Sequence, residues 1–389
     1  MTESSFQSGF FVDALWRDAW SRQRFTQAVE LTMPKSLCLQ AQQEITQWND
    51  YQVTRLQALD DYASQAGIGS VYCKDEGTRF GLGSFKALGG AYAVDHIARS
   101  RSAGLTVSCA TEGNHGRSVA WGAKRAGVRC VIFLHEGVSK AREASIAHYG
   151  AEIIRVPGSY DDAVRQCTLT SAQNNWQIVS DTSWPGYEDI PRRVMAGYSV
   201  IGQELLQQMD KPPTHVFLQA GVGGMAASLM ASFSRCWPDT DIRYIIVEPR
   251  QAACLMASVR AAGTYKTTPG PFNTILAGLA CGEPSLSVLE LIYEGAHMML
   301  ALDDSSIKDA MHQFARPCGQ DPKIVAGASG AAGLAGLQAV LQVPMLKKQL
   351  GLGPDSRVLL INTECDTDPK AYQDIIAACD QASSGPGHA

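Results

Sequence analysis

The chain has 389 residues, of which 45% are hydrophobic and 18% charged, and its formal net charge at pH 7 is -5. This composition is typical of a globular protein, and the length favours two units with separate cores. An acidic balance without basic runs argues against a nucleic-acid partner, and no apolar run approaches membrane-spanning length. The 11 cysteines are scattered singly. We therefore expect reduced thiols, no metal site and no membrane contact, in a cytoplasmic protein.

Strand-like and helix-like patterns alternate regularly after residue 70, whereas residues 1–69 carry no recognisable chemistry. Regular alternation predicts an α/β fold with parallel sheets covered by helices. We expect two open parallel-sheet lobes with a cleft between them, a large one of residues 1–88 and 206–389 and a small one of residues 89–205. The expected strands are 71–74, 106–110, 129–134, 152–156, 176–180, 215–219, 244–247, 298–302 and 358–361. The expected helices are 114–126, 139–149, 192–209 and 225–235, with others beginning near residues 86, 161, 305 and 329.

One lysine, Lys86, directly follows a glycine-serine turn and begins a predicted helix. The N-terminal end of a helix dipole disfavours a cation, so a charged lysine is unexpected at this position. An amine that is neutral, or covalently bound to an aldehyde, removes the conflict, and such chemistry needs a lowered pKa. A solvated turn lysine is the alternative. The helix also carries small residues at helical spacing, which predicts close packing against a sheet: Ala87, Gly90, Ala91, Val94, Ile97 and Ala98.

A second glycine-rich turn, Gly221-Val222-Gly223-Gly224, follows a predicted strand and begins a predicted helix. Backbone N–H groups and the helix dipole converge there, which predicts a phosphate site. With Ala226 and Glu248 the turn also fits a dinucleotide fingerprint, so a nicotinamide dehydrogenase is an alternative, and a purely structural turn is another. The chain has no second fingerprint, and hydride transfer does not require the Lys86 segment. Both points favour a simple phosphate group.

Three motifs occur in order along the chain: Gly83-Ser84-Phe85-Lys86, Thr111-Glu112-Gly113-Asn114-His115-Gly116 and the turn 221–224. Together they resemble the fold-type II enzymes of pyridoxal phosphate, the group of threonine dehydratase and cysteine synthase. Further stretches at 180–187 and 362–369 bring the chain closest to the diaminopropionate ammonia-lyase family. The resemblance implies a tryptophan synthase β-like fold with pyridoxal 5'-phosphate in the interdomain cleft, and a homodimer.

The resemblance also assigns roles to individual residues. Lys86 holds the cofactor covalently, and the turn 221–224 with Met225 binds its phosphate. Asn114 bonds the phenolic oxygen, and Thr363 lies beside the ring nitrogen. A neutral hydroxyl there leaves that nitrogen mostly unprotonated, which suits β-elimination. The residues expected to bind the substrate are Thr111, Gly113, His115 and Tyr187.

Two carboxylates are expected to move protons. Asp181 follows a predicted strand, at the end where open α/β sheets bind ligands, although a turn cap is the alternative interpretation. In the family the matching acid is associated with the L-isomer of the substrate. The acid of the Thr-Asp-Gly-Asn-His-Gly motif is associated with the D-isomer, and here it is Glu112, one methylene longer.

The implied activity is the cleavage of 2,3-diaminopropionate, a small amino acid, into pyruvate and two ammonia molecules. A dehydratase or β-replacement enzyme acting on serine-, threonine- or hydroxyaspartate-like amino acids is an alternative. A regulatory protein that holds pyridoxal phosphate with weak turnover is another. Cys365 replaces a family glycine, and Ala328 stands where related dehydratases carry an acid. These departures concern the substrate more than the fold.

Overall fold

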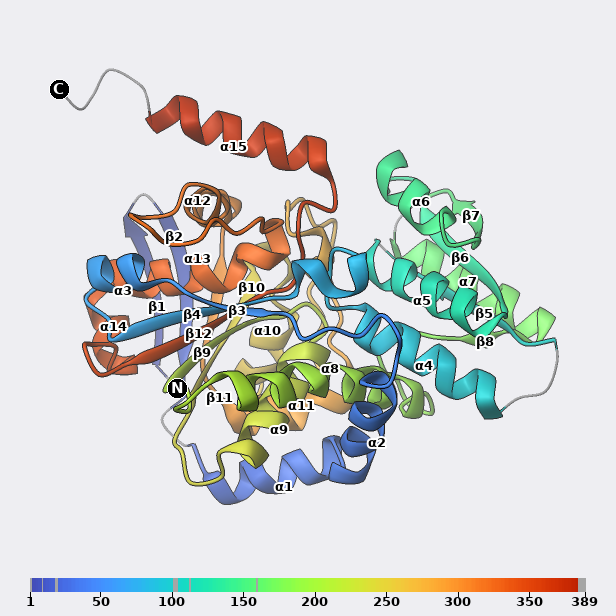
Figure 1. Cartoon of the computed structure of the whole chain (residues 1–389), viewed down its shortest axis with the longest axis horizontal. Helices are drawn as coiled ribbons and strands as arrows, with labels where there is room; N and C mark the ends of the chain where they lie inside the picture. Colours follow the sequence, from blue (N-terminus) through green and yellow to red (C-terminus); the bar gives the residue numbers. More distant parts are fainter. Residues whose placement is uncertain are drawn as a thin grey trace.

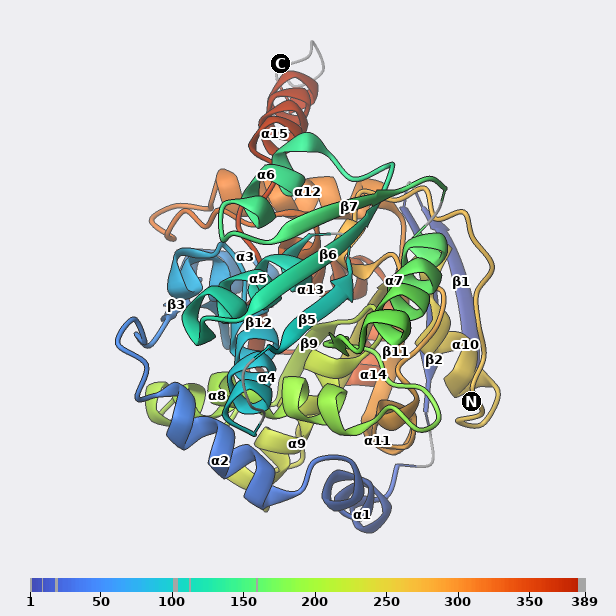
Figure 2. The same cartoon turned by 90° about the vertical axis from the view of Figure 1, so that its right-hand side faces the viewer.

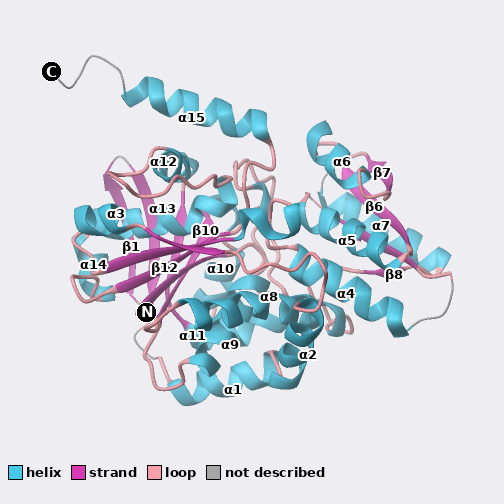
Figure 3. Ribbon diagram, viewed as in Figure 1, coloured by secondary structure: helices cyan, strands magenta, loops and turns pink. Residues whose placement is uncertain are grey.

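The computed structural model describes residues 2–8, 10–17, 20–100, 104–111, 113–158 and 160–383. Two groups of strands lie side by side, each with helices on both sides (Figures 1 and 3). Within the described residues, the large sheet has the strand order β1-β2-β11-β10-β9-β12-β4-β3 and the small sheet the order β7-β6-β5-β8.

The large sheet consists of β1 (Thr2–Ser8), β2 (Phe10–Trp16), β3 (Arg55–Ala58), β4 (Ser70–Asp75), β9 (His215–Gln219), β10 (Arg243–Pro249), β11 (Ala296–Leu302) and β12 (Arg357–Asn362). The small sheet consists of β5 (Thr106–Ala110), β6 (Arg129–His135), β7 (Glu152–Val156) and β8 (Gln177–Ile178). The helices are α1 (Arg22–Thr32), α2 (Lys35–Ile45), α3 (Asp60–Ala66), α4 (Ala87–Ser100), α5 (Asn114–Ala126), α6 (Lys140–Ala147), α7 (Tyr160–Asn174), α8 (Asp189–Gln208), α9 (Gly224–Cys236), α10 (Cys254–Arg260), α11 (Leu289–Gly295), α12 (Asp304–Ala315), α13 (Ala328–Gln342), α14 (Pro344–Leu350) and α15 (Pro369–Ser383).

The large sheet contains the expected parallel strands and is extended at both edges by antiparallel ones, so it is mixed. Its central strands β11, β10, β9, β12 and β4 run parallel. At one edge β2 pairs antiparallel with β11 and β1 with β2, and at the other edge β3 pairs antiparallel with β4. The antiparallel edge strands all come from residues 1–69, the part of the chain in which no strand was predicted. The small sheet is parallel throughout its described pairs.

Alternate residues of the central strands pack into two different cores. Phe217 and Ile245 belong to a core that includes residues of α12 and α13. Val216 and Ile246 belong to the core that includes residues of α8 and α9. Because these parallel strands are covered on both faces, their sequences are continuously apolar. Strands β9 and β12 pair in parallel, so their carboxyl ends lie beside each other at one edge of the sheet, where the site forms.

Helices α4 and α8 join the two sheets. A Cβ atom at Gly197 would overlap with the carbonyl oxygen of Leu88, and one at Gly90 would overlap with the Ser118 hydroxyl. The small-residue stripe after Lys86 therefore packs against α8 and α5, not against a sheet as expected. This close packing fixes the start of α4, and with it the backbone of Lys86.

The small sheet lies nearest the viewer in Figure 2, with β5, β6 and β7 in front. Its strands fall within residues 89–205 and those of the large sheet fall outside that range. The boundaries at 88/89 and 205/206 themselves stay predictions. In the part of the chain that the structure describes, no single helix is long and apolar enough to cross a membrane; α13 and α14 meet that test only as a pair, across a bend of 109°.

Candidate active site

One cavity brings together most of the residues that the sequence predicted for the site. It is lined by loops that follow β5, β9 and β12 and by the start of α4. Two predicted residues are not placed there: Tyr187 does not line the cavity, and Glu112 lies outside the described residues. The predicted residues that line it are Lys86, Thr111, Gly113, Asn114, His115, Asp181, Gly221, Val222, Gly223, Gly224, Met225 and Thr363.

Lys86 forms an ion pair in this cavity. It directly precedes α4, and its Nζ donates to Asp181 Oδ2 over 2.5 Å. Burial lowers the pKa of Lys86, but the charge and hydrogen bond of Asp181, together with Tyr198 and Cys281, raise that pKa above its ordinary value. The expected lowered pKa is thus not found: the amine is a paired ammonium. The dipole conflict at the helix start is resolved by a carboxylate instead.

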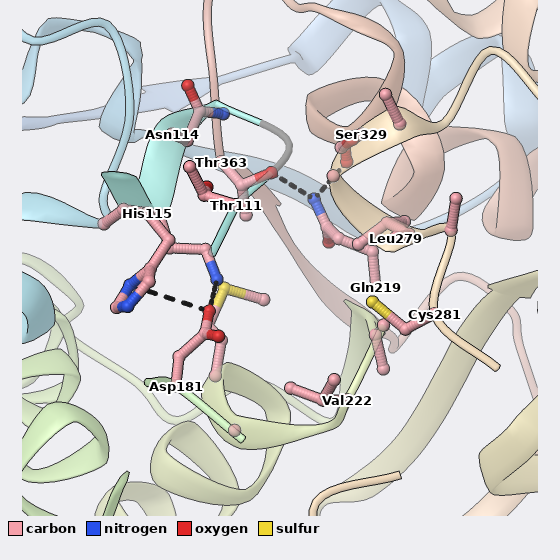
Figure 4. A pocket seen from close by; sticks show the side chains of 18 of the residues that line it. Thr111, Asn114, His115, Asp181, Gln219, Val222, Leu279, Cys281, Ser329 and Thr363 are labelled. Atoms are coloured by element: carbon pink, nitrogen blue, oxygen red, sulfur yellow. Dashed lines mark hydrogen bonds and ion pairs between the residues drawn. The ribbon is translucent and has the colours of Figure 1, made fainter. Parts of the chain in front are cut away.

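Asp181 contacts a second titratable group, His115 (Figure 4). His115 Nε2 lies 2.8 Å from the carbonyl oxygen of Val179, which can only accept, so Nε2 carries a proton. Nδ1 lies 3.8 Å from Asp181 Oδ2. Burial lowers the pKa of His115. Burial raises the pKa of Asp181, but His115 and Lys86 together lower it below its ordinary value. Asp181 is therefore ionised at neutral pH.

The glycine turn connects β9 to α9 and forms a second wall. Gly223 has φ +96°, and a Cβ atom there would lie 2.8 Å from Val288 Cγ2. A Cβ atom at Gly221 would lie 3.1 Å from Leu279 Cα. The first N–H groups of α9 have no partner within the helix, and the dipole adds positive potential. The two glycines let the turn pack closely against Leu279 and Val288, and the turn with Met225 is suited to bind an anion.

Hydrogen bonds connect Gln219, Ser329 and Thr363 in another part of the cavity wall (Figure 4). Gln219 Nε2 donates to the carbonyl oxygens of Ile361 and Ser329 over 2.8 and 2.9 Å, and lies 3.2 Å from Thr363 Oγ1. An amide nitrogen only donates, so Thr363 accepts and keeps its own O–H proton for a ligand. Ser329 Oγ is buried, lines the cavity and has no hydrogen-bond partner in the described part of the chain.

The loop before α5 was expected to bind the substrate. Thr111 Oγ1 accepts from the N–H groups of Gly113 and Gly116, each over 3.0 Å. The N–H of Gly113 is therefore engaged by Thr111, which acts as a cap. The N–H groups of Asn114 and His115 at the start of α5 remain directed along the helix axis.

Tyr187 has a different place from the one predicted. Its hydroxyl donates to the carbonyl oxygen of Ile178 over 2.9 Å and accepts from the N–H of Ser180 over 3.0 Å. Its ring stacks on Trp184 with 4.2 Å between centroids. The side chain thus supports the loop that carries Asp181, and its hydroxyl is not directed at the cavity.

Sequence reasoning missed several residues of the cavity wall, namely Gln219, Ser329, Glu364 and Tyr198. Glu364 directly follows Thr363, so its place at the end of a buried strand was the available signal. Gln219 ends its predicted strand in the same way. Tyr198 lies within α8, where its contact with the Lys86 region depends on helix packing. No local pattern marks such a residue.

The dinucleotide interpretation required Glu248 to face a ribose. Its carboxylate is buried and accepts from the N–H groups of Leu255 and Met256 over 2.9 and 2.8 Å. Burial raises its pKa to about 8. Glu248 caps the start of α10 and is not available to a sugar hydroxyl, so the structure does not support this alternative.

These residues fit pyridoxal phosphate. Lys86 supplies an amine, the turn before α9 supplies an anion site, and Thr363 supplies a hydroxyl donor at 3.2 Å from Gln219. Ser329 Oγ and His115 Nδ1 are buried polar atoms without hydrogen-bond partners among the described residues, as expected in a wall that receives a polar ligand.

Comparisons with known proteins agree with this geometry. A family model described as "Pyridoxal-phosphate dependent enzyme" matches residues 48–364. Diaminopropionate ammonia-lyase of Escherichia coli (strain K12) is 38% identical over 349 residues, covering 84% of this chain and 87% of the relative. A crystal structure of the Escherichia coli enzyme with an aminoacrylate-PLP azomethine reaction intermediate superposes with a TM-score of 0.86 at 35% identity, covering 97% and 99% of the two chains. The same enzyme in complex with D-serine gives 0.87 at 34% identity, covering 98% and 100%. The chain belongs to the pyridoxal-phosphate dependent enzyme family.

Proposed function

We propose that this protein is a pyridoxal phosphate-dependent ammonia-lyase that converts 2,3-diaminopropionate into pyruvate and two ammonia molecules. The observation that carries the proposal is the ion pair between Lys86 Nζ and Asp181 Oδ2, at 2.5 Å, in a cavity that the glycine turn 221–224 also lines. The match to diaminopropionate ammonia-lyase over most of both chains supports it. Pyridoxal phosphate, when bound, supplies the electron sink for β-elimination.

Lys86 and Asp181 exchange a proton in this proposal. Lys86 must be neutral to react with an aldehyde, and Asp181 Oδ2 is near enough to accept its proton directly. With the cofactor held by Lys86 and the turn 221–224, the Asp181 carboxylate would be the group that takes the α-proton of the L-substrate on Oδ2.

The N-terminus of α5 orients the substrate. The N–H groups of Asn114 and His115, together with the helix dipole, favour the carboxylate of an amino acid. His115 Nε2 donates to the carbonyl oxygen of Val179, which fixes the orientation of the ring beside this helix start.

The charge of the cavity favours a diamino acid over a hydroxy amino acid. Two carboxylates, Asp181 and Glu364, line the cavity with the single ammonium of Lys86 among its described lining residues. An excess of negative charge stabilises the second ammonium group of 2,3-diaminopropionate, which serine lacks.

A dehydratase acting on serine-like amino acids is the second candidate. The observation in its favour is that the matching Escherichia coli enzyme has been crystallised with D-serine. A cofactor-holding regulatory protein would have the same fold and bound pyridoxal phosphate but little turnover. The family resemblance further suggests that the protein is a homodimer.

A product assay over a panel of amino acids tests the proposal. We expect L-2,3-diaminopropionate to give pyruvate and ammonia in a ratio of about one to two, with a higher kcat/KM than L-serine, L-threonine or 3-hydroxyaspartate. A higher kcat/KM on L-serine would favour the dehydratase. Full cofactor occupancy without turnover on any of these amino acids would favour the regulatory protein.

A further inference from the structure

Glu364 is a buried carboxylate in the cavity wall that the proton steps above do not use. It follows Thr363 after β12. One oxygen, Oε1, accepts from the N–H of Ser329 over 3.1 Å, and the other, Oε2, accepts from Asn114 Nδ2 over 2.5 Å. The side chain therefore connects the large sheet to the first residue of α5.

Asn114 is held from both ends of its carboxamide. Arg117 Nη2 donates to Asn114 Oδ1 over 2.8 Å, while Asn114 Nδ2 donates to Glu364. A guanidinium can only donate and a carboxylate can only accept, so the Asn114 carboxamide can be oriented in only one way. Turning the carboxamide by 180° would set two donors against each other at Arg117 and two acceptors at Glu364. Only one N–H of the carboxamide remains for another partner, and Asn114 lines the cavity.

Glu364 is itself fixed by α13. Its Oε1 accepts the N–H of Ser329 in the first turn of that helix, where a negative charge is favoured. Its backbone oxygen accepts the N–H of Gly327 over 2.9 Å, and a Cβ atom at Gly330 would overlap with that oxygen. An acceptor held at its backbone and its carboxylate loses little further freedom when it binds Asn114.

We infer that Glu364 is a positioning residue that acts through Asn114, presenting the remaining Nδ2–H to the phenolic oxygen of pyridoxal phosphate. The chain from Arg117 through Asn114 to Glu364 also polarises the carboxamide, which strengthens that donor. The inference rests on the proposed function only in so far as Asn114 contacts the cofactor. It does not depend on which amino acid is cleaved.

The Glu364→Gln variant removes one of the two acceptors and leaves the volume almost unchanged. Its single oxygen can serve Ser329 or Asn114 but not both. We expect the dissociation constant of pyridoxal phosphate, measured by titrating the apoprotein and following cofactor absorbance, to rise roughly tenfold. The matched control is Glu143→Gln. Glu143 lies on α6 and pairs with Arg155, so this change should leave the dissociation constant unchanged.

A double-mutant cycle separates positioning from a general structural role. If Glu364 acts through Asn114, then Glu364→Gln should have almost no further effect on the dissociation constant in an Asn114→Ala background. Arg117 and Glu364 hold Asn114 from both ends, and we call this pair of contacts the clamp. Arg117→Met removes the Arg117 contact, so it should weaken pyridoxal phosphate binding in the parent but not in the Asn114→Ala background. Thermal unfolding of the apoproteins shows whether Glu364→Gln folds. If it does not, Arg117→Met still tests the same clamp.

Two outcomes overturn the inference, and a third separates it from the proposed function. An effect of Glu364→Gln that is equally large with and without Asn114 would show that Glu364 acts by another route. An unchanged dissociation constant in both Glu364→Gln and Arg117→Met would show that the clamp does not matter. A parent protein that binds pyridoxal phosphate but cleaves no 2,3-diaminopropionate would refute the proposed function alone and leave this inference to stand on the binding cycle.

Discussion

Lys86 Nζ lies 2.5 Å from Asp181 Oδ2, although the two residues are 95 positions apart in the chain. Lys86 is fixed by the packing of α4 on α8, and Asp181 by the loop that Tyr187 ties to β8. The pair therefore depends on the relative placement of two helices and a loop. Each charge is stabilised by the other in a site that is largely removed from water.

Asp181→Asn should lower the pKa of Lys86. Burial alone lowers that pKa, and Asp181 is the largest influence that raises it. The measurement is the pH dependence of Lys86 labelling by an amine reagent in the apoprotein, quantified on the Lys86 peptide. We expect labelling to begin at lower pH in the variant than in the parent. An unchanged or higher midpoint would show that Asp181 does not hold the ammonium.

The two enantiomers of 2,3-diaminopropionate should not be cleaved equally well. Removing the α-proton of each enantiomer requires a base on its own face, and the family resemblance assigns Asp181 to the L-isomer and Glu112 to the D-isomer. Glu112 is one methylene longer than the family acid, and a misplacement of about 1 Å can cost roughly a hundredfold in rate. We expect kcat/KM to be much lower on the D-isomer. Asp181→Asn should abolish cleavage of the L-isomer, and Glu112→Gln should affect only the D-isomer. Similar kcat/KM values for both enantiomers in the parent would contradict these roles.

Gly224→Ala should weaken cofactor binding without disturbing the fold. A Cβ atom there would lie 3.4 Å from Met195 Cγ and 3.9 Å from the Asp181 carbonyl oxygen, so it fits the protein itself. It would occupy space at the anion site, where backbone N–H groups must approach closely. Equilibrium dialysis should show the dissociation constant of pyridoxal phosphate raised tenfold or more. Gly353→Ala, where no atom lies within 4 Å of the new Cβ, is the control. Normal cofactor binding by Gly224→Ala would place the phosphate elsewhere.

Two buried histidines should make the fold sensitive to acid. Burial lowers the pKa of His215 and of His297 to about 4, from an ordinary value of 6.5. The unfolded chain therefore binds more protons between those values, and the free energy of unfolding should fall as pH falls from about 6.5 to about 4. Above pH 6.5 both residues are neutral in either state and contribute no slope.

His215→Gln tests this directly. His215 Nε2 lies 2.7 Å from the Leu350 carbonyl oxygen and Nδ1 lies 2.8 Å from Thr214 Oγ1, and a carboxamide can replace both hydrogen bonds without titrating. Urea unfolding at pH 7 and pH 4.5 should show a smaller difference in the variant than in the parent. His148→Gln, at an exposed position after α6, is the control. An equal pH dependence in parent and His215→Gln would contradict the assignment.

The sequence predicted the strands and helices with strong local periodicity. Helix α5 and strands β7 and β9 begin and end where expected. Each of these strands has a short apolar run, and Gly127 ends α5, so local signals sufficed. Strands β1 and β2 were missed because β2 pairs with β11, which lies far along the chain, and β1 pairs with β2 in turn.

Candidate residues within motifs were placed more reliably than the contacts between them. The turn 221–224, Lys86 and Asp181 were predicted from the strand and helix context and the family resemblance, and they line one cavity. The ion pair of Lys86 and the clamp on Asn114 are directional contacts between distant segments, and periodicity carries no information about them. Tyr187 lies in a motif that matches the family, but the motif did not predict its contacts. Its hydroxyl forms hydrogen bonds with the backbone.

Lys86 is the residue on which the account of the site depends. The most direct test is to treat the purified holoprotein with borohydride, digest it and identify the peptide that carries the reduced cofactor. We predict a yellow protein that loses its colour on reduction, with pyridoxyl label on Lys86 alone, and a Lys86→Ala protein that takes up no label and has no turnover. Recovery of the label on a different lysine, or full activity in Lys86→Ala, would contradict the account.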